Sequence, residues 1–333
     1  MSIYSIQPVT LGGLHTYPLA SRKSKVSIRE FATPTGVKPS LRKFLDSLPK
    51  ILAAQDLREL LIAIHRAKRH KKAILWGLSG HVIKVGLGPV LIDLMKNGFV
   101  SGIAMNGAAL VHDFEIAMAG NTSENVEQGL GSGLFGMAHE TGLCLNEMAK
   151  LAHRIRIGYG EAAGQYLTSG ILAPKHPDSS ILIAAYRQRI PVTIHLAIGT
   201  DVPHMHPAAE GAALGAATYL DFRLFCGLIQ QMDSGGVFLN WGSAVLLPEV
   251  FLKAVSVVRN LGVSLSSITT ANCDFIQHYR PIQNVVKRPT APLKGKTGAS
   301  KGYAITGHHE LLLPLIAAGL TAGWPGSGKR GKR

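Results

Sequence analysis

The stretch LWGLSGHVIKVGLGPVLIDLMKNGFVSGIAMNGAALVHDFE, residues 75–115, decides the fold. It holds two apolar runs, at 73–76 and 99–105, which break at the small-residue turns GLSG and NGA. The amphipathic segment 81–97 lies between them and predicts a helix. Strand, turn, helix, strand and turn in this order predict a parallel α/β unit. Anionic ligands bind at the carboxyl ends of such strands, because helix N-termini present free backbone N–H groups there.

The same alternation continues along the chain. Further apolar runs predict strands at 191–198, 236–240 and 263–270. Apolar residues at helical spacing predict helices at 49–70, 140–152, 179–188, 208–231, 248–261 and 308–321. Strands separated by helices predict an α/β fold, with a doubly wound, mostly parallel sheet and helices on both of its faces.

Length and composition indicate one large globular domain. The chain has 333 residues, of which 46% are hydrophobic and 17% charged, which is enough for a sizeable core. We expect an irregular N-terminal arm at 1–45, a single α/β domain at 46–322 and a disordered basic tail at 323–333.

The chain carries no pattern that predicts membrane insertion or secretion. No apolar run reaches the roughly 18 residues of a membrane span, and the N-terminus lacks the apolar core of a signal peptide. Three cysteines, an odd number, lie in or beside apolar sequence. Reduced thiols and a cytoplasmic location are therefore expected.

The net charge of +15 is concentrated outside the body of the chain. Residues 51–279 carry equal numbers of acidic and basic residues, and the excess lies in 1–50, 280–301 and the tail. We therefore do not expect a nucleic-acid partner. The segment 280–301 is either a solvated loop or a basic surround for an anionic ligand or partner.

Titratable residues follow several predicted strands. They are His112, Asp113 and Glu115; His195, Asp201, His204 and His206; and His308, His309 and Glu310. The second group has ligand types that suit zinc or iron. It equally fits histidines that cap elements or hydrogen-bond a cofactor, and we assign no metal.

Taken in order, these clusters resemble deoxyhypusine synthase over residues 45–320. The similar segments are LSGHVIKVGLGPVLIDLMKNGFV, NGAALVHDFE, YRQRIPVTIHLAIGTD, GGVFLNWGSAVLLPEVFLKAV, ITTAN and ELLLPLIAAGL. The resemblance implies a Rossmann-like subunit in a homotetramer, with NAD held in clefts at a dimer interface. It also implies transfer of an aminobutyl group from spermidine to a protein lysine, through a hydride step and an enzyme-bound imine.

The resemblance also implies which residues contact the cofactor. The NAD-contacting turns correspond to Ser79, Gly80, Asn106, Gly107, Ala108, Thr270 and Ala271. The acidic residue after the second turn corresponds to Asp113, which we expect to accept the ribose hydroxyls. Small residues at such turns let the backbone approach a dinucleotide closely.

The catalytic half departs from the family pattern. The Trp-Gly-Lys motif that carries the family's nucleophile is absent, and Lys287 in CDFIQHYRPIQNVVKRP is an approximate match. Lys287 is therefore either an imine-forming nucleophile or a surface lysine. One acid, Asp274, stands there among basic residues, which favours an anionic substrate over a polyamine. His204, His206 and His308 are the expected acid–base groups.

Two functions remain open. The first is an NAD-dependent enzyme of the deoxyhypusine synthase superfamily, which performs transferase-type chemistry through a hydride and imine step on an amine or other small substrate. A protein lysine is a possible acceptor. The second is a non-catalytic NAD-binding scaffold or sensor, whose basic arms contact RNA or an acidic partner. Convergence of His204, His206 and His308 on one pocket would favour the enzyme.

Overall fold

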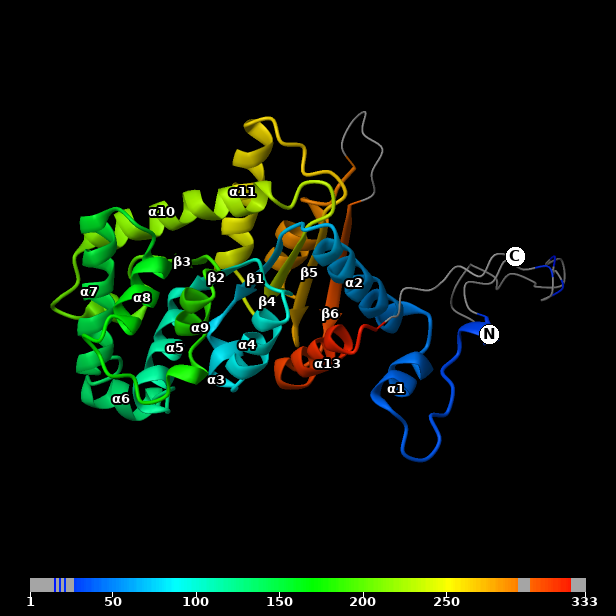
Figure 1. Ribbon diagram of the computed structural model, residues 1–333, viewed down its shortest axis with the longest axis horizontal. Coiled ribbons are helices and arrows are strands. Elements are labelled where there is room, and N and C mark those ends of the chain that lie inside the picture. Colours follow the sequence, from blue (N-terminus) through cyan, green and yellow to red (C-terminus); the bar gives the residue numbers. More distant parts are fainter. Residues whose placement is uncertain (1–14, 16–17, 19–20, 22–26, 293–299, 325–333) are drawn as a thin grey trace, which may run out of the picture.

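The core of the molecule is a six-stranded, all-parallel sheet. The computed structural model describes residues 15, 18, 21, 27–292 and 300–324 (Figure 1). The strand order is β3-β2-β1-β4-β5-β6. The strands are β1 Ile74–Leu78, β2 Gly102–Asn106, β3 Val192–His195, β4 Val237–Trp241, β5 Thr269–Asp274 and β6 Lys301–Thr306. The order reverses between β1 and β4, which confirms the predicted doubly wound sheet.

Helices cover both faces of the sheet. The α-helices are α1 Leu41–Ser47, α2 Leu52–Arg69, α3 Gly80–Lys84, α4 Gly88–Lys96, α5 Gly107–Ala119, α6 Val126–Ser132, α7 His139–Ile155, α8 Tyr159–Thr168, α9 Ile181–Arg187, α10 Gly211–Gln230, α11 Leu246–Asn260, α12 Tyr279–Pro281 and α13 His309–Thr321. Short 3₁₀ turns are η2 Ile28–Glu30, η3 Pro177–Ser179 and η4 Val202–Met205, and the π-helical turn η5 spans Ile282–Lys287. Helices α10 and α11 pack against one face; α2, α4 and α13 pack against the other.

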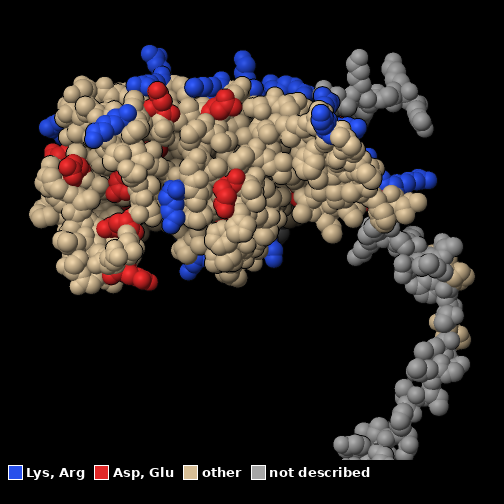
Figure 2. Space-filling view, turned by 90° about the horizontal axis from the view of Figure 1, so that it is seen from below, with Lys and Arg blue, Asp and Glu red and all other residues tan. Residues whose placement is uncertain are grey.

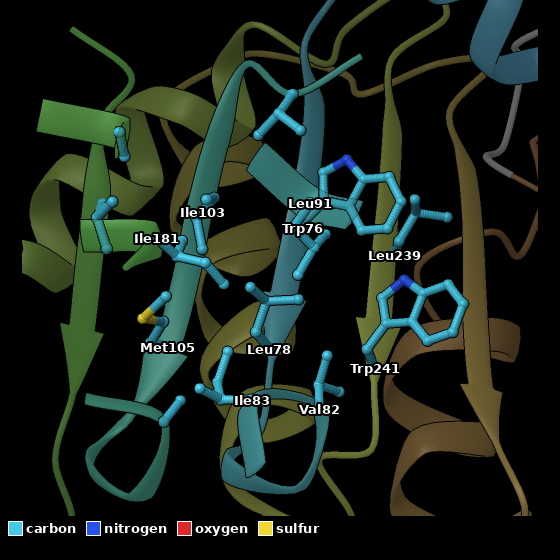
Figure 3. Packing of buried hydrophobic residues seen from close by; sticks show 14 of the residues in the cluster. Trp76, Leu78, Val82, Ile83, Leu91, Ile103, Met105, Ile181, Leu239 and Trp241 are labelled. Atoms are coloured by element: carbon cyan, nitrogen blue, oxygen red, sulfur yellow. The ribbon is translucent and has the colours of Figure 1, made fainter. Parts of the chain in front are cut away.

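The central strands are apolar because both of their faces are covered. Every residue of β1 and β4 is buried. The rings of Trp76 and Trp241 lie nearly parallel, with centroids 5.9 Å apart, beside Leu78 (Figure 3). The indole Nε1 of Trp76 donates to the carbonyl of Phe99 at 2.9 Å. This packing fixes the two strands that flank the reversal in strand order.

The edge strand β3 is sealed by side chains of α10. The backbone N–H of Ile194 donates to Asp221 at 2.7 Å, and Thr218 Oγ1 donates to the carbonyl of Ile194 at 2.8 Å. The N–H of Leu196 donates to Thr218 Oγ1 at 3.0 Å. These bonds occupy groups that would otherwise pair with another strand.

Helix α10 is the one described helix whose length and composition would let it cross a bilayer. It packs on α7, α8 and β3 within the fold, and its side chains seal β3. Within the structure, 44% of its apolar window is buried.

The sequence-based elements needed several corrections, and helices α1, α6 and α8 were not predicted. Strand β6 was not predicted, and the run predicted at 263–270 is displaced from the observed β5. The predicted helix 81–97 is two helices, α3 and α4, separated by residues 85–87. The segment after the second small-residue turn is helix α5, which was not predicted. β6 was missed because its burial alternates along an exposed edge, so it lacks a continuous apolar run.

Both expected domain boundaries also shift slightly. Helix α1 crosses the boundary expected at residue 45. Trp324, the second residue of the expected disordered tail, is fully buried and donates from Nε1 to Asp46 at 2.8 Å. Residues 325–333 of the predicted tail lie outside the described residues.

Candidate functional site

Polar residues line the carboxyl edge of the sheet. Asn106 and His195 are paired at the ends of β2 and β3, and Asp274 and Thr306 are paired at the ends of β5 and β6. Ser79 follows directly after β1. Because all six strands are parallel, these side chains gather at one edge. In open α/β sheets, ligands bind outside this edge, at the point where the strand order reverses.

A small polar nest lies where the order reverses. Gly242, directly after β4, has a φ of +69°, and a Cβ there would lie 2.6 Å from both Ser79 Oγ and His309 Cε1. Glycine is therefore required both for the backbone conformation and for the space. The Ser79 hydroxyl is buried and has no hydrogen-bond partner among the described residues. A buried hydroxyl without a partner is unusual enough to indicate a ligand or ordered water.

The imidazole of His309 forms a dyad with Asp274. Its Nε2 lies 3.2 Å from the carbonyl of Cys273 and 3.5 Å from Asp274 Oδ1. A carbonyl only accepts, so Nε2 carries the proton. Nδ1 is buried and unpartnered among the described residues. Burial lowers the pKa of His309, although Asp274 opposes the effect. The ring is therefore neutral near pH 7, with a free lone pair on Nδ1.

A cavity of about 720 Å³ opens beside the N-terminus of α5. Acidic side chains lie on the lobe at the left of Figure 2, which carries α6 and α7 (Figures 1 and 2). The polar residues that line the cavity are Lys84, His112, Glu115, Asn121, Thr122, Ser123, Glu124, Thr141, Thr200 and Asp201. The volume suits a small-molecule ligand or one half of a larger one.

One wall of the cavity is an ordered hydrogen-bond chain. Thr122 Oγ1 donates to Glu115 Oε2 at 2.5 Å and lies 2.7 Å from His112 Nδ1. The single Thr122 proton goes to Glu115, so His112 Nδ1–H donates to Thr122. Thr141 Oγ1 donates to Glu115 Oε1 at 3.1 Å. Burial lowers the pKa of His112. The chain therefore holds a neutral imidazole and a fixed carboxylate against the cavity.

Asp201 lies at the N-terminus of α5. A Cβ on Gly107 would overlap its carboxylate, so the glycine leaves room for the acid. Burial raises the pKa of Asp201 to about 6, opposed by the backbone N–H of Ala197. Its Oδ2 is buried without a partner among the described residues. An acceptor is thus available where the helix meets the cavity.

The predicted turn residues lie at this edge, but they serve partly in packing. A Cβ on Gly80 would lie 2.9 Å from Ala108 Cβ and from His112 Cδ2, so this glycine lets α3 approach α5. Asn106 caps α5, accepting from the N–H of Ala109 at 2.9 Å. Ala108 lines the cavity. Ser79, Asn106 and Gly107 lie at the carboxyl edge, where they can contact a ligand.

Asp113 does not face the cavity, which corrects its assignment as the ribose-binding residue. Its carboxylate is fully buried. It accepts from the Ser180 hydroxyl at 2.6 Å and from the N–H groups of Ile181 and Leu182 at 2.7 and 3.1 Å. Burial raises the pKa of Asp113 to about 6, and these three bonds oppose the rise. Asp113 thus caps the N-terminus of α9.

Thr270 and Ala271 also differ from their predicted role. Both lie inside β5 and are fully buried, rather than in a turn. Thr270 Oγ1 donates to the carbonyl of Val285 at 2.6 Å. The prediction placed the end of this strand too early, and the residue at the carboxyl edge is Asp274.

Lys287 lies at the opposite edge of the sheet, which corrects its assignment as nucleophile. It ends η5, whose Val285 bonds to Thr270 near the start of β5. Gly302, near the start of β6, contacts the neighbouring Val286 carbonyl. The Lys287 side chain is exposed. It therefore has neither the burial nor the position that an imine-forming lysine at the carboxyl edge needs.

The three expected acid–base histidines do not converge. His204 and His206 follow β3, whereas His308 follows β6, and these are the two outer strands of the sheet. Five interstrand spacings place β3 and β6 roughly 24 Å apart. His204 Nδ1 accepts from the N–H of Gly199 at 3.1 Å, and His206 Nδ1 accepts from that of Ala208 at 3.1 Å. Both rings thus brace their own loop.

The alternative of a metal at His195, Asp201, His204 and His206 has no geometric support. His195 is fully enclosed by protein, and its Nε2 lies 3.0 Å from Thr193 Oγ1. Burial lowers the pKa of His195 to about 3. Across residues 27–292 and 300–324, no three His, Cys, Asp or Glu side chains gather as a metal site would require.

Sequence reasoning missed two parts of the site. Ala108, Val111, His112 and Glu115 line the cavity at helical spacing, a signal that was readable once residues 107–119 were recognised as a helix. The second part is the Asp274–His309 dyad. Its signal lay in the strand TTANCD, which ends on an acid, and in the pair HH of GHHE, where the second histidine and not the first points inward.

Comparisons with known proteins give a likeness in fold. No protein-family model matches the chain, and no curated protein matches it. A conserved protein provisionally assigned as LOR/SDH from Methanococcus maripaludis S2 has 16% identity and a TM-score of 0.49, with 82% of this chain and 71% of that one covered. The ternary complex of AgrE with ornithine and NAD+ has 17% identity and a TM-score of 0.46, with 82% and 34% covered.

The search of solved structures found a further similar protein. It is provisionally assigned as a deoxyhypusine synthase from Entamoeba histolytica, with 11% identity and a TM-score of 0.47, and 87% of this chain and 96% of that one are covered. These likenesses concern the course of the chain alone.

Proposed function

We propose that the protein is an NAD-dependent enzyme, with the dinucleotide lying across the carboxyl edge of the sheet. The observation that carries the proposal is the nest at Gly242, where the Ser79 hydroxyl and the His309 ring meet and where Ser79 Oγ is buried and unpartnered among the described residues, as is Nδ1 of that ring. This nest lies where the strand order reverses, the position at which such sheets bind dinucleotides. The choice of NAD follows the sequence resemblance.

The adenosine half fits the cavity beside α5. Ribose hydroxyls donate hydrogen bonds, and the carboxylates of Glu115, Glu124 and Asp201 on the cavity wall can accept them. The same carboxylates would repel a ribose 2′-phosphate, so NAD is favoured over NADP. Lys84 also lines the cavity and is the described cation placed to meet a phosphate there.

We place the nicotinamide half at the nest. Its carboxamide oxygen can accept a hydrogen bond from the Ser79 hydroxyl, which leaves the lone pair of His309 Nδ1 free. When bound, NAD supplies a hydride acceptor. The residues of this chain then hold the ring, exclude water and receive a proton. The rings of His81, Phe275 and Trp241, with centroids 5.3, 6.0 and 6.0 Å from that of His309, provide the apolar walls.

We propose hydride transfer with an amine or another small substrate as the chemistry. The transferase step through an imine on Lys287 is left out, because Lys287 lies at the other edge. A homotetramer with sites at a dimer interface, a protein lysine as acceptor and a cytoplasmic location remain proposals that rest on the resemblance.

Calorimetry on the full chain tests this function. We expect NAD and ADP-ribose to bind, and NADP to bind at least about tenfold more weakly because of the cavity carboxylates. Glu115→Gln should weaken ADP-ribose, while Glu161→Gln, on α8 away from this cavity, should leave it unchanged. Absence of heat with NAD and ADP-ribose would contradict the proposal.

A non-catalytic NAD-binding scaffold is the second candidate. The scatter of Lys287, His204, His206 and His308 favours it, because no predicted catalytic group meets another. The two candidates differ in turnover. The NAD-bound protein is incubated with a panel of small alcohols and amines, and formation of NADH is followed by absorbance. NADH production supports the enzyme; binding without production across the panel supports the scaffold.

A further inference from the structure

We infer that His309 is the proton acceptor of this site, with Nδ1 as the accepting atom and Asp274 as its positioning residue. The inference rests on the proposed function. It names a substrate class: a small molecule whose reacting carbon bears a hydrogen and a hydroxyl or amino group. No feature of the sequence pointed to His309 ahead of its exposed neighbour His308.

The first support is that the structure fixes which ring nitrogen is bare. Nε2 faces the Cys273 carbonyl, which cannot donate, so the proton of the neutral ring is on Nε2. Nδ1 is buried with no partner among the described residues, and the ring that carries it approaches Gly242 through Cε1. An unpaired lone pair in a buried site is what a general base needs.

The second support is the carboxylate behind the ring. Asp274 Oδ1 lies 3.5 Å from Nε2, and its side chain is 5% exposed. Asp274 is itself held by the N–H of Phe275 at 2.8 Å. A carboxylate on the far side of an imidazole orients the ring and stabilises the imidazolium that forms when the near nitrogen takes a proton.

The third support is that the aromatic side chains next to His309 are partly exposed. Phe275 is 43% exposed, stacks on His308 with centroids 5.8 Å apart and planes 8° apart, and also contacts His81. His309 beneath it is fully buried. Exposed side chains change rotamer quickly, so Phe275 and His308 can move while the strands below stay in place.

The chemistry balances with the groups named. In the substrate, the O–H or N–H bond breaks and its proton goes to Nδ1. The C–H bond breaks and its electron pair leaves with the hydrogen as hydride, which reduces NAD to NADH. The bonding pair from the O–H or N–H forms the new C=O or C=N bond. The substrate is oxidised by two electrons, and His309 is left as an imidazolium facing Asp274.

Several titratable groups face this ring. Asp274 on β5 and Glu310 on α13 favour the imidazolium, whereas His81 on α3 disfavours it. His308, the residue before His309, lies above Phe275. A pH profile therefore reports on this group of side chains together.

The test uses the full chain labelled with ¹⁵N-histidine, with trifluoroethanol and trifluoroethylamine as unreactive probes for the two substrate types. In the free protein we expect the His309 resonances of an Nε2–H ring. In the NAD complex, one probe should shift the Nδ1 resonance, and that probe identifies the substrate type. His309→Gln, which keeps a donor for Cys273, should weaken that probe at least about fivefold and NAD less than about twofold. His278→Gln, at an exposed position nearby, is the control.

The outcomes separate the two proposals. An Nδ1–H ring in the free protein overturns the inference, whatever NAD does. Probe binding that His309→Gln leaves unchanged overturns it too, as does the absence of any probe effect in a complex that binds NAD. Failure of the wild-type protein to bind NAD contradicts the proposed function instead. If His309→Gln does not fold, the protonated nitrogen of the wild-type ring still tests the inference. Probe binding by His309→Asn, whose amide takes the place of Nδ1, is then measured in place of His309→Gln.

Discussion

Replacing Ser79 by alanine should have opposite effects on the free protein and on its NAD complex. The Ser79 hydroxyl is buried without a partner among the described residues, and an unpaired buried hydroxyl costs about 1–3 kcal/mol. Ser79→Ala removes that cost with the loss of a single oxygen. The free energy of unfolding of the free protein should therefore stay equal or rise, by up to about 1 kcal/mol.

The NAD complex should behave in the opposite way. A neutral hydrogen bond between the hydroxyl and the cofactor contributes about 0.5–1.5 kcal/mol, which is about 2- to 13-fold in Kd. Urea unfolding gives the first quantity and calorimetry gives the second, on the same two proteins. The account requires weaker NAD binding by a protein that is no less stable.

Ser180→Ala is the matched control. Its hydroxyl donates to Asp113 at 2.6 Å and accepts from the N–H of Ile183 at 3.2 Å. Losing these bonds should cost about 1–3 kcal/mol of stability and leave NAD affinity unchanged, because Ser180 is far from the nest in the fold. If Ser79→Ala destabilises the protein as Ser180→Ala does and binds NAD normally, the Ser79 hydroxyl is structural and the reasoning is refuted.

Three further predictions concern the buried acid, the glycine of the nest and the displaced lysine. Burial raises the pKa of Asp221 from 3.8 to about 7; the unfolded chain loses this proton near pH 3.8 while the folded protein keeps it, so the free energy of unfolding should fall as pH rises through that window. Asp221→Asn should remove a total fall on the order of 4 kcal/mol across that window, measured by urea unfolding at several pH values, and an unchanged fall would exclude Asp221 as its source. Gly242→Ala should abolish detectable NAD binding, because its Cβ would lie 2.6 Å from Ser79 Oγ and His309 Cε1. The control is Gly262→Ala, at a φ of +92° with nothing within 4 Å, which should cost about 1 kcal/mol of stability and leave NAD binding unchanged. Equal effects of the two variants on NAD binding would contradict the nest. Lys287→Ala should leave NAD affinity unchanged, and borohydride reduction in the presence of carbonyl compounds should not trap an adduct at Lys287; mass spectrometry showing such an adduct would restore the imine hypothesis.

The sequence predicted the parallel sheet because its central strands are unbroken apolar runs. The runs that became β1, β2, β3 and β4 were found, since strands buried on both faces leave a continuous signal. The strand β6 is an edge strand with alternating burial, and its signal is no stronger than that of a loop. The strand β5 was displaced because its polar end, Asn272 to Asp274, does not resemble a buried strand.

The sequence located the site at the carboxyl edge of the sheet, but it identified only some of the residues there. Small-residue turns located the carboxyl edge, where Ser79, Asn106 and Gly107 lie. The assignment of Asp113 failed because the rotation of α5 decides which acidic side chain faces the cavity. Residues 112 and 115 share the face of Ala108, whereas residue 113 points toward α9. A single sequence does not reveal that rotation before the neighbouring helices are placed.

Hydrogen–deuterium exchange on the full chain, with and without NAD, tests the central claim most directly, because it locates the cofactor on the fold. The account predicts slower exchange at the turns after β1, β2 and β4, residues 79–81, 107–109 and 242–243, and no change at η5 and the start of β6. Protection at η5 and the start of β6 with the three turns unchanged, or no protection anywhere at saturating NAD, would contradict it.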